Sequence, residues 1–113
     1  MRYEVLVDSG ADLCFFDLEL AEIIGLDPKK GDKIFFVGVT GTQRVAYVHD
    51  IEINVGGHAV KTKAAFAALP SQGYGIVGQR GFFEFFRVIF DYQKKQVELR
   101  DKTVTQARMK KAA

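Results

Sequence analysis

Hydrophobic residues recur along most of the chain with the period of β-strands, in short runs separated by glycines. Ile51, Ile53 and Val55 alternate with polar residues, which is typical of a strand with one buried face. The pair Gly56-Gly57 that follows is a hairpin turn signal. The pattern as a whole predicts a small, mainly β domain of sandwich or barrel type. Its expected strands and short apolar runs are residues 3–7, 34–37, 44–48, 51–55, 59–66, 76–78, 88–90 and 96–99.

One or two short helices are expected between these strands. Asp17 is expected to cap a helix, because apolar residues recur at helical spacing after it, and Gly25 is expected to end that helix in a left-handed conformation. Residues 81–86 carry four phenylalanines and are expected to form one or two helical turns that serve packing. Residues 27–32 are expected to form a polar turn, and residues 38–42 the tip of a hairpin.

Composition limits the classes of protein. The chain has 113 residues, 48% of them hydrophobic and 27% charged, as expected for one soluble globular domain. The hydrophobic pattern stops near Asp101, so we expect a folded domain over residues 1–100 and a basic, flexible tail over residues 101–113. A net charge of +2 does not require a polyanionic partner, and no nucleic acid is expected. No apolar run is long enough to cross a bilayer, and residues 1–4 lack the core of a signal peptide, so the default location is the cytoplasm.

The single cysteine, Cys14, excludes a disulfide within the chain. It lies in the apolar run 13–16, which predicts a buried structural thiol and not a nucleophile. His49 and His58 show no metal-ligand spacing with Cys14, so we expect no metal site and no cofactor.

The clearest candidate for chemistry is Asp8-Ser9-Gly10, a carboxylate at the end of an apolar strand followed by a hydroxyl and a glycine. The strand would hold Asp8 rigidly, Ser9 can hydrogen-bond to lock the turn, and Gly10 lets another backbone come close. If two such turns meet, their carboxylates hold one proton between them; one then activates a water and the other donates to a scissile carbonyl oxygen. Asp-Ser-Gly is also a common turn sequence, so the tripeptide alone does not distinguish a site from a plain turn.

A second segment, Ile76-Val77-Gly78, favours a site over a plain turn. Two apolar residues followed by a glycine suit a strand that passes close beneath the Asp8 turn. Together with Asp8-Ser9-Gly10-Ala11 and the closing hairpin over residues 90–99, this segment resembles the retropepsin-like aspartic proteases, in particular their bacterial and retroelement members. The order and separation of the parts also match, and the resemblance runs from about residue 5 to residue 99.

The resemblance implies a small acid-protease barrel with one lobe per chain. It further implies an aspartic endopeptidase that works as a homodimer on a peptide or protein substrate, without a cofactor. Asp8 matches the catalytic carboxylate, with Ser9 and Gly10 in the same turn. The hairpin tip near residues 38–42 matches a flap that closes over the substrate. The implied substrate-binding residues are Ala11, Asp12, Gly38, Val39, Thr40 and Gly41, and the residues implied to support the site are Ile76, Val77, Gly78 and Arg80.

The sequence departs from the family pattern in two places. After Gly78, where many members have Arg followed by Asp or Asn, this chain has Gln79 and Arg80. Arg80 is expected to reach Asp12 from one residue out of register, or Gln79 to substitute with a hydrogen bond. Members also have an extra hairpin before the catalytic strand, whereas seven residues precede Asp8 here, which we interpret as a truncated or naturally trimmed start.

Two alternatives to an active enzyme follow. The short start favours a non-catalytic dimerisation or peptide-binding module that keeps the protease fold, and an exposed sheet edge there would invite pairing with another chain. A β-barrel that binds nucleic acid through the basic tail is the third hypothesis, and it predicts salt-dependent binding that is lost when residues 101–113 are removed.

Overall fold

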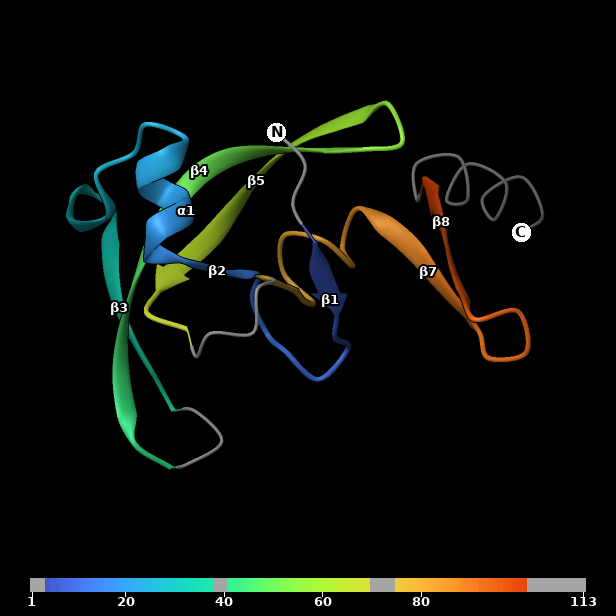
Figure 1. Ribbon diagram of the computed structural model, residues 1–113, viewed down its shortest axis with the longest axis horizontal. Coiled ribbons are helices and arrows are strands. Elements are labelled where there is room, and N and C mark those ends of the chain that lie inside the picture. The colour runs from blue at the N-terminus through green and yellow to red at the C-terminus, as the bar shows by residue number, and fades with distance from the viewer. Residues whose placement is uncertain (1–3, 38–40, 70–74, 102–113) are drawn as a thin grey trace, which may run out of the picture.

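The computed structural model describes residues 4–37, 41–69 and 75–101, and most of these residues lie in strands (Figure 1). One sheet has the strand order β1-β6-β2-β5-β4-β3, and β7 and β8 form a separate two-stranded sheet. The mainly β architecture is as the sequence predicts. The strands are β1 (Val5–Val7), β2 (Phe15–Asp17), β3 (Asp32–Val37), β4 (Gln43–Val55), β5 (His58–Ala67), β6 (Gly75–Val77), β7 (Phe86–Asp91) and β8 (Gln96–Asp101).

The hairpin of β4 and β5 is the longest element of the sheet. The expected turn at Gly56-Gly57 is confirmed, and both glycines have positive φ, which a tight hairpin turn requires. The expectation of two strands over residues 44–48 and 51–55 is wrong, because β4 is one strand of 13 residues. His49 and Asp50 pair with Ala64 and Lys63 of β5, so the ladder continues through the polar residues that had indicated a break.

The helix predicted after residue 16 is confirmed as α1 (Leu18–Ile23). Asp17 caps it, because its Oδ2 accepts a hydrogen bond from the Glu19 N–H at 2.9 Å. Gly25 follows with φ +86°, the expected left-handed conformation. The polar turn after it contains one 3₁₀ turn, η1 (Pro28–Lys30), capped by Asp27.

Residues 81–86 form hydrogen-bonded turns but no regular helix, so of the one or two helical turns expected there only a single turn is present. Gly81 has φ +95°, and single turns close through N–H groups of Phe85 and Phe86 that donate to the Phe82 carbonyl. Phe86 then enters β7, where it pairs with Asp101, so the chain is drawn into a strand before a helix can propagate. The hairpin that follows, β7 with β8, was expected and is confirmed.

A short strand that the pattern did not predict, β2, connects the two halves of the main sheet. It runs parallel to β5 and pairs with β6 through Phe15 and Ile76. Three residues are too few to show a period, which explains why the sequence showed only an apolar run there.

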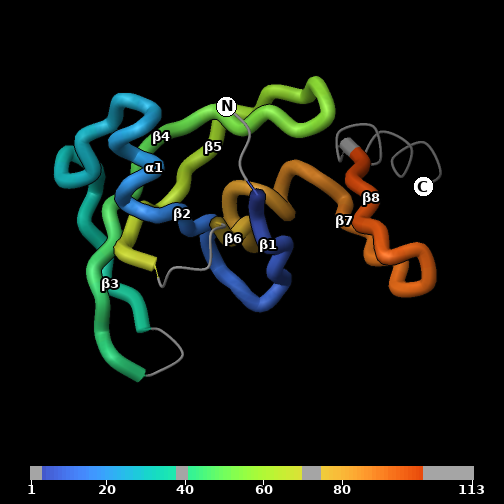
Figure 2. Tube along the Cα trace, in the orientation of Figure 1, coloured from blue at the N-terminus to red at the C-terminus, as the bar shows by residue number. Residues whose placement is uncertain are grey.

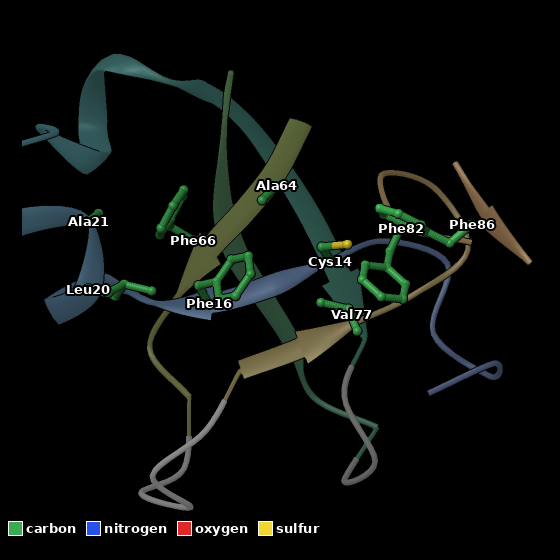
Figure 3. Close-up of a cluster of buried hydrophobic side chains, with 9 residues drawn as sticks. All are labelled: Cys14, Phe16, Leu20, Ala21, Ala64, Phe66, Val77, Phe82 and Phe86. Atoms are coloured by element: carbon green, nitrogen blue, oxygen red, sulfur yellow. The ribbon is translucent and has the colours of Figure 1, made fainter. Parts of the chain in front are cut away.

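The main core lies on one side of the sheet, between β2, β5 and β6 and the turn before β7 (Figure 3). Phe66 and Cys14 are fully buried, and Val77 is 2% exposed. Phe82 and Phe86 join the core with ring centroids 5.2 Å apart, so the packing role expected for the phenylalanines is confirmed for this pair. The full cluster is Cys14, Phe16, Leu20, Ala21, Ala64, Phe66, Val77, Phe82 and Phe86.

The hairpin of β7 and β8 extends to one side of the molecule, as the chain trace shows (Figure 2). Its near end packs on the main core through Phe86, Val88 and Leu99. At its far end Phe90 is 56% exposed and Val97 is 45% exposed. A second, smaller core on the other side of the main sheet contains Ala46, Ala65 and Ala67, with Phe15 and Phe36 packed against it.

Candidate active site

The pairing of β1 with β6 determines where Asp8 lies. The two strands are parallel, with Val5 opposite Gly75 and Val7 opposite Val77. The Asp8 N–H donates to the Val77 carbonyl at 3.0 Å, so the main chain of Asp8 continues the ladder by one residue. Asp8 therefore begins the turn from an anchored backbone, at the carboxyl end of β1.

The turn after β1 closes on the Asp8 side chain. The Gly10 N–H donates to Asp8 Oδ1 at 2.9 Å, and the Ala11 N–H donates to the Asp8 carbonyl at 3.2 Å. Asp8 is half-buried, whereas Ser9 and Gly10 are exposed. One carboxylate oxygen is thus held by the turn itself, and no residue in the described part of the chain forms an ion pair with Asp8.

Gly10 and Gly78 differ in what surrounds them. A Cβ at Gly10 would lie 3.2 Å from the side-chain atom Asp8 Oδ1 and would meet no other described atom. A Cβ at Gly78 would lie 2.5 Å from the carbonyl oxygens of both Ala11 and Leu13. The close backbone approach within one chain therefore occurs at Gly78, which passes against the segment after the Asp8 turn.

The residues after Gly78 continue this contact. The Gln79 N–H donates to the Ala11 carbonyl and the Arg80 N–H donates to the Asp12 carbonyl, each at 2.8 Å. The expected pairing of Arg80 with Asp12 is therefore made by the main chain, and among the described ion pairs none joins their side chains. The alternative, a substituting hydrogen bond from Gln79 to Asp12, is not among the described hydrogen bonds. Gln79 Nε2 donates to the Ser9 carbonyl at 2.6 Å instead.

Below this crossing lie Val77 and Cys14, both buried. The Gly78 N–H donates to Cys14 Sγ, and the thiol donates to the Arg80 carbonyl, each at 3.5 Å. Burial raises the pKa of the Cys14 thiol above its ordinary value of 9.0, against the opposing effect of the Gly78 hydrogen bond. The expected buried structural thiol is confirmed, but its contact with the two segments was not visible in the sequence. Ile76, half-buried, pairs with Phe15.

The hairpin of β3 and β4 corresponds to the expected flap. Its tip at Gly38, Val39 and Thr40 lies outside the described residues, and the next residue, Gly41, has φ +78°. The base of the hairpin is attached to the sheet, because the Phe36 ring packs on Phe15 with centroids 5.0 Å apart.

Arg44 adds a second attachment at this base. Its guanidinium lies over the Phe36 ring, 5.9 Å from the centroid, and it donates to the Ala68 carbonyl. These aromatic and guanidinium contacts join segments far apart in the sequence. Nothing in the sequence had indicated that Phe15, Phe36 or Arg44 would make them.

The comparison with protein families decides the identity of this arrangement. A family model described as aspartyl protease matches residues 2–80, which is well over half of the chain. The chain belongs to the aspartyl protease family. The matched span contains the Asp8 turn, the β3–β4 hairpin and the Gly78 crossing, and the mainly β fold agrees with a retropepsin-like member. No curated protein and no solved structure matches the chain significantly.

Two hollows of the molecule lie away from Asp8. One of about 650 Å³ borders β4, β5 and the turn at Gly81, and one of about 230 Å³ lies between α1, β1 and β4. Asp8 lines neither of them. Within the described ranges there is no group of three or more His, Cys, Asp or Glu residues placed to hold a metal ion. Over the same ranges, no helix has the length and apolar character that a membrane crossing needs.

Proposed function

We propose that this protein is an aspartic endopeptidase that acts as a homodimer, in which each chain contributes Asp8 to the reaction. The observation that carries the proposal is the placement of Asp8: its backbone is hydrogen-bonded to Val77, and its half-buried carboxyl group is held by the Gly10 N–H. The sequence contains a single Asp-Ser-Gly turn, and the chemistry needs two carboxylates, so we propose that a second copy of the chain supplies the other one.

In the proposed mechanism the two Asp8 carboxyl groups share one proton, because two like charges held so close do not both ionise. The ionised carboxylate takes a proton from a water whose oxygen attacks the carbonyl carbon of the peptide bond. The protonated carboxyl donates its proton to the carbonyl oxygen, which gives a neutral tetrahedral intermediate. The carboxyl that took the water proton then gives it to the nitrogen, and the other carboxylate takes back a proton from a hydroxyl of the intermediate. The C–N bond breaks, which releases an amine and a carboxylic acid and restores the singly protonated pair.

The proposed substrate is an extended peptide that lies between the Asp8 turns and the β3–β4 hairpins. An extended peptide presents main-chain donors and acceptors that pair with a neighbouring backbone, as an added strand does. Ala11 and Asp12 follow the catalytic turn, and Gly41 is the first described residue after the hairpin tip. These three residues are the proposed contacts on the two sides of the peptide. Gly38, Val39 and Thr40 remain predicted contacts from the sequence alone.

The test is cleavage of an unfolded protein at mildly acidic pH, with and without a pepsin-type transition-state inhibitor. The wild-type chain is expected to give cleavage that the inhibitor abolishes. Asp8→Asn is expected to lose activity by more than about a thousandfold, because an amide cannot act as the base. Asp50→Asn is the matched control, since Asp50 is an exposed residue that forms a surface pair with Lys63.

Mixing the wild-type and Asp8→Asn chains tests the homodimer directly. If both carboxylates are needed, an equal mixture that has exchanged subunits keeps about a quarter of the wild-type activity, the fraction of dimers with two intact copies. A chain that cleaves alone would keep about half, which contradicts the shared site. A confirmed dimer without inhibitor-sensitive cleavage would instead support the non-catalytic binding module.

A further inference from the structure

The side chain of Gln79 contacts the catalytic turn from the segment that follows Gly78. Its Nε2 donates to the Ser9 carbonyl at 2.6 Å, across 70 positions of sequence. The main chain of Gln79 is itself held on both sides. Its N–H donates to the Ala11 carbonyl at 2.8 Å, and its carbonyl accepts from the Glu84 N–H at 3.2 Å. Only the side-chain torsions of Gln79 need to be ordered for the contact to form.

The Ser9–Gly10 peptide links this contact to the Asp8 carboxylate. A peptide unit is planar, with its C=O and N–H pointing in opposite directions. The Ser9 carbonyl of this unit accepts from Gln79, and the Gly10 N–H of the same unit donates to Asp8 Oδ1 at 2.9 Å. Rotation of the peptide plane would break both hydrogen bonds together, so the two bonds depend on one orientation.

Packing does not restrain this peptide plane. Ser9 and Gly10 are both exposed, and a Cβ at Gly10 would meet only the Asp8 carboxyl oxygen. Glycine also tolerates the backbone conformations on either side of a peptide rotation. Hydrogen bonds therefore decide the orientation, and the Gln79 donor favours the one in which the N–H points at Asp8.

We propose that Gln79 is a positioning residue for the reaction, holding the Gly10 N–H toward the carboxylate that acts as base. A donor in this place orients the carboxylate and stabilises its negative charge. Donation to the Ser9 carbonyl also polarises the N–H of the same peptide, which strengthens its bond to Asp8. The role in catalysis rests on the proposed function, whereas the orientation of the peptide does not.

The experiment compares variants of the full chain by two measurements, kcat with KM and the Gly10 amide proton shift measured by NMR in the folded and in the urea-unfolded chain. Gln79→Met keeps the length of the side chain without a donor. It is expected to lower kcat about tenfold with little change in KM, since without the Gln79 donor the Gly10 N–H is no longer held toward the Asp8 carboxylate. The Gly10 response is the downfield displacement of the Gly10 amide proton in the folded chain, relative to the unfolded chain, that its hydrogen bond to the Asp8 carboxyl produces. In Gln79→Met at least about half of this displacement is expected to disappear.

Three further variants separate this role from a general effect on folding. Gln79→Arg retains N–H donors and is expected to restore both the Gly10 response and kcat. Gln79→Glu removes the donor and adds a charge, and Gln93→Glu makes the same change at the exposed tip of the β7–β8 hairpin. Gln93→Glu is expected to leave both measurements unchanged.

The outcomes of the proposal and of the proposed function are distinguishable. A Gln79→Met chain that keeps the full Gly10 response and the wild-type kcat shows that Gln79 does not position the turn. If the wild-type chain cleaves no peptide, the proposed function fails, and the Gly10 response still decides whether Gln79 orients the Ser9–Gly10 peptide.

Discussion

The inner part of the main sheet, around β2, β5 and β6, and the outer hairpin of β3 and β4 use similar apolar residues in different ways. In the inner part Phe66 is fully buried and Val77 is 2% exposed. In the outer hairpin Phe35 is 61% exposed and Val37 is 69% exposed. The inner strands have both faces covered, whereas β3 is an edge strand with one face packed on the second core and the other in water.

This difference separates a tightly packed inner sheet, which holds Asp8, from an outer hairpin with one exposed face. Asp8 is held where main chains pass in close contact, so a small change of volume there must move backbone. The outer hairpin is attached at Phe36 and Arg44, and on its other face Phe35 and Val37 are mostly exposed. A carboxylate held by main-chain hydrogen bonds in the inner part of the sheet suits the proposed reaction on an extended peptide.

The largest expected effect comes from replacing a phenylalanine by alanine once in the inner sheet and once in the outer hairpin. Phe66→Ala is expected to lower the free energy of unfolding by about 3–5 kcal/mol, because it leaves a cavity beside Phe16 and His49. Phe35→Ala is expected to change it by less than about 0.5 kcal/mol, since the ring is mostly in water. Urea denaturation measures both. Equal losses of stability in the two variants would contradict the difference in burial between the inner sheet and the outer hairpin.

A second test addresses the close main-chain contact in the inner part. Gly78→Ala is expected to cost about 3 kcal/mol of stability, because the new Cβ would meet two backbone carbonyl oxygens that cannot move independently of the strands. Gly25→Ala is the control: its φ of +86° is unfavourable for alanine, but no atom lies within 4 Å of the new Cβ. That variant is expected to cost about 1–2 kcal/mol. A Gly78→Ala chain as stable as the control would show that the segments need not pass so closely.

The smallest test uses the titration of Cys14, which lies beneath the same contact. Burial raises the pKa of this thiol in the folded chain, whereas the unfolded chain ionises near 9.0. The thiol therefore contributes its full stability below pH 9.0, and this contribution falls as the pH rises toward the folded pKa. The expected loss relative to Cys14→Ser, which does not titrate there, is at most about 1.4 kcal/mol per pH unit.

Urea denaturation of both chains on either side of the thiol's ordinary pKa measures this difference. Parallel stability curves for wild type and Cys14→Ser at alkaline pH would mean that the thiol is accessible to water in the folded chain. The inner part of the sheet would then be more open than its burial indicates.

Local features of the chain were predictable wherever the physical cause acts over a few residues. Asp17 as a helix cap and Gly56-Gly57 as a hairpin turn follow from backbone geometry that neighbouring residues decide. Failures occurred where pairing with distant strands took over. Residues 49 and 50 are polar, yet the β5 ladder carries β4 through them, and Phe86 joins β7 instead of a helix.

The candidate site likewise has one part that could be predicted from the sequence and one part that could not. The Asp8 turn was visible in the sequence because a carboxylate, a hydroxyl and a glycine after an apolar strand form a local motif. The choice between Gln79 and Arg80 was not, since it depends on where each side chain lies after Gly78 has crossed the segment from Ala11 to Leu13.

The sequence alone established that the chain is rich in β-strands and that it contains a single Asp-Ser-Gly turn. It could do so because the alternation of apolar and polar residues and the chemistry of turns are short-range properties. Three-dimensional packing decided that β6 holds Asp8 from the side, that Cys14 lies beneath Gly78, and that Gln79 reaches the Ser9 carbonyl. These contacts span more than 60 positions of sequence, and only the balance of burial and backbone pairing over the whole domain brings such segments together.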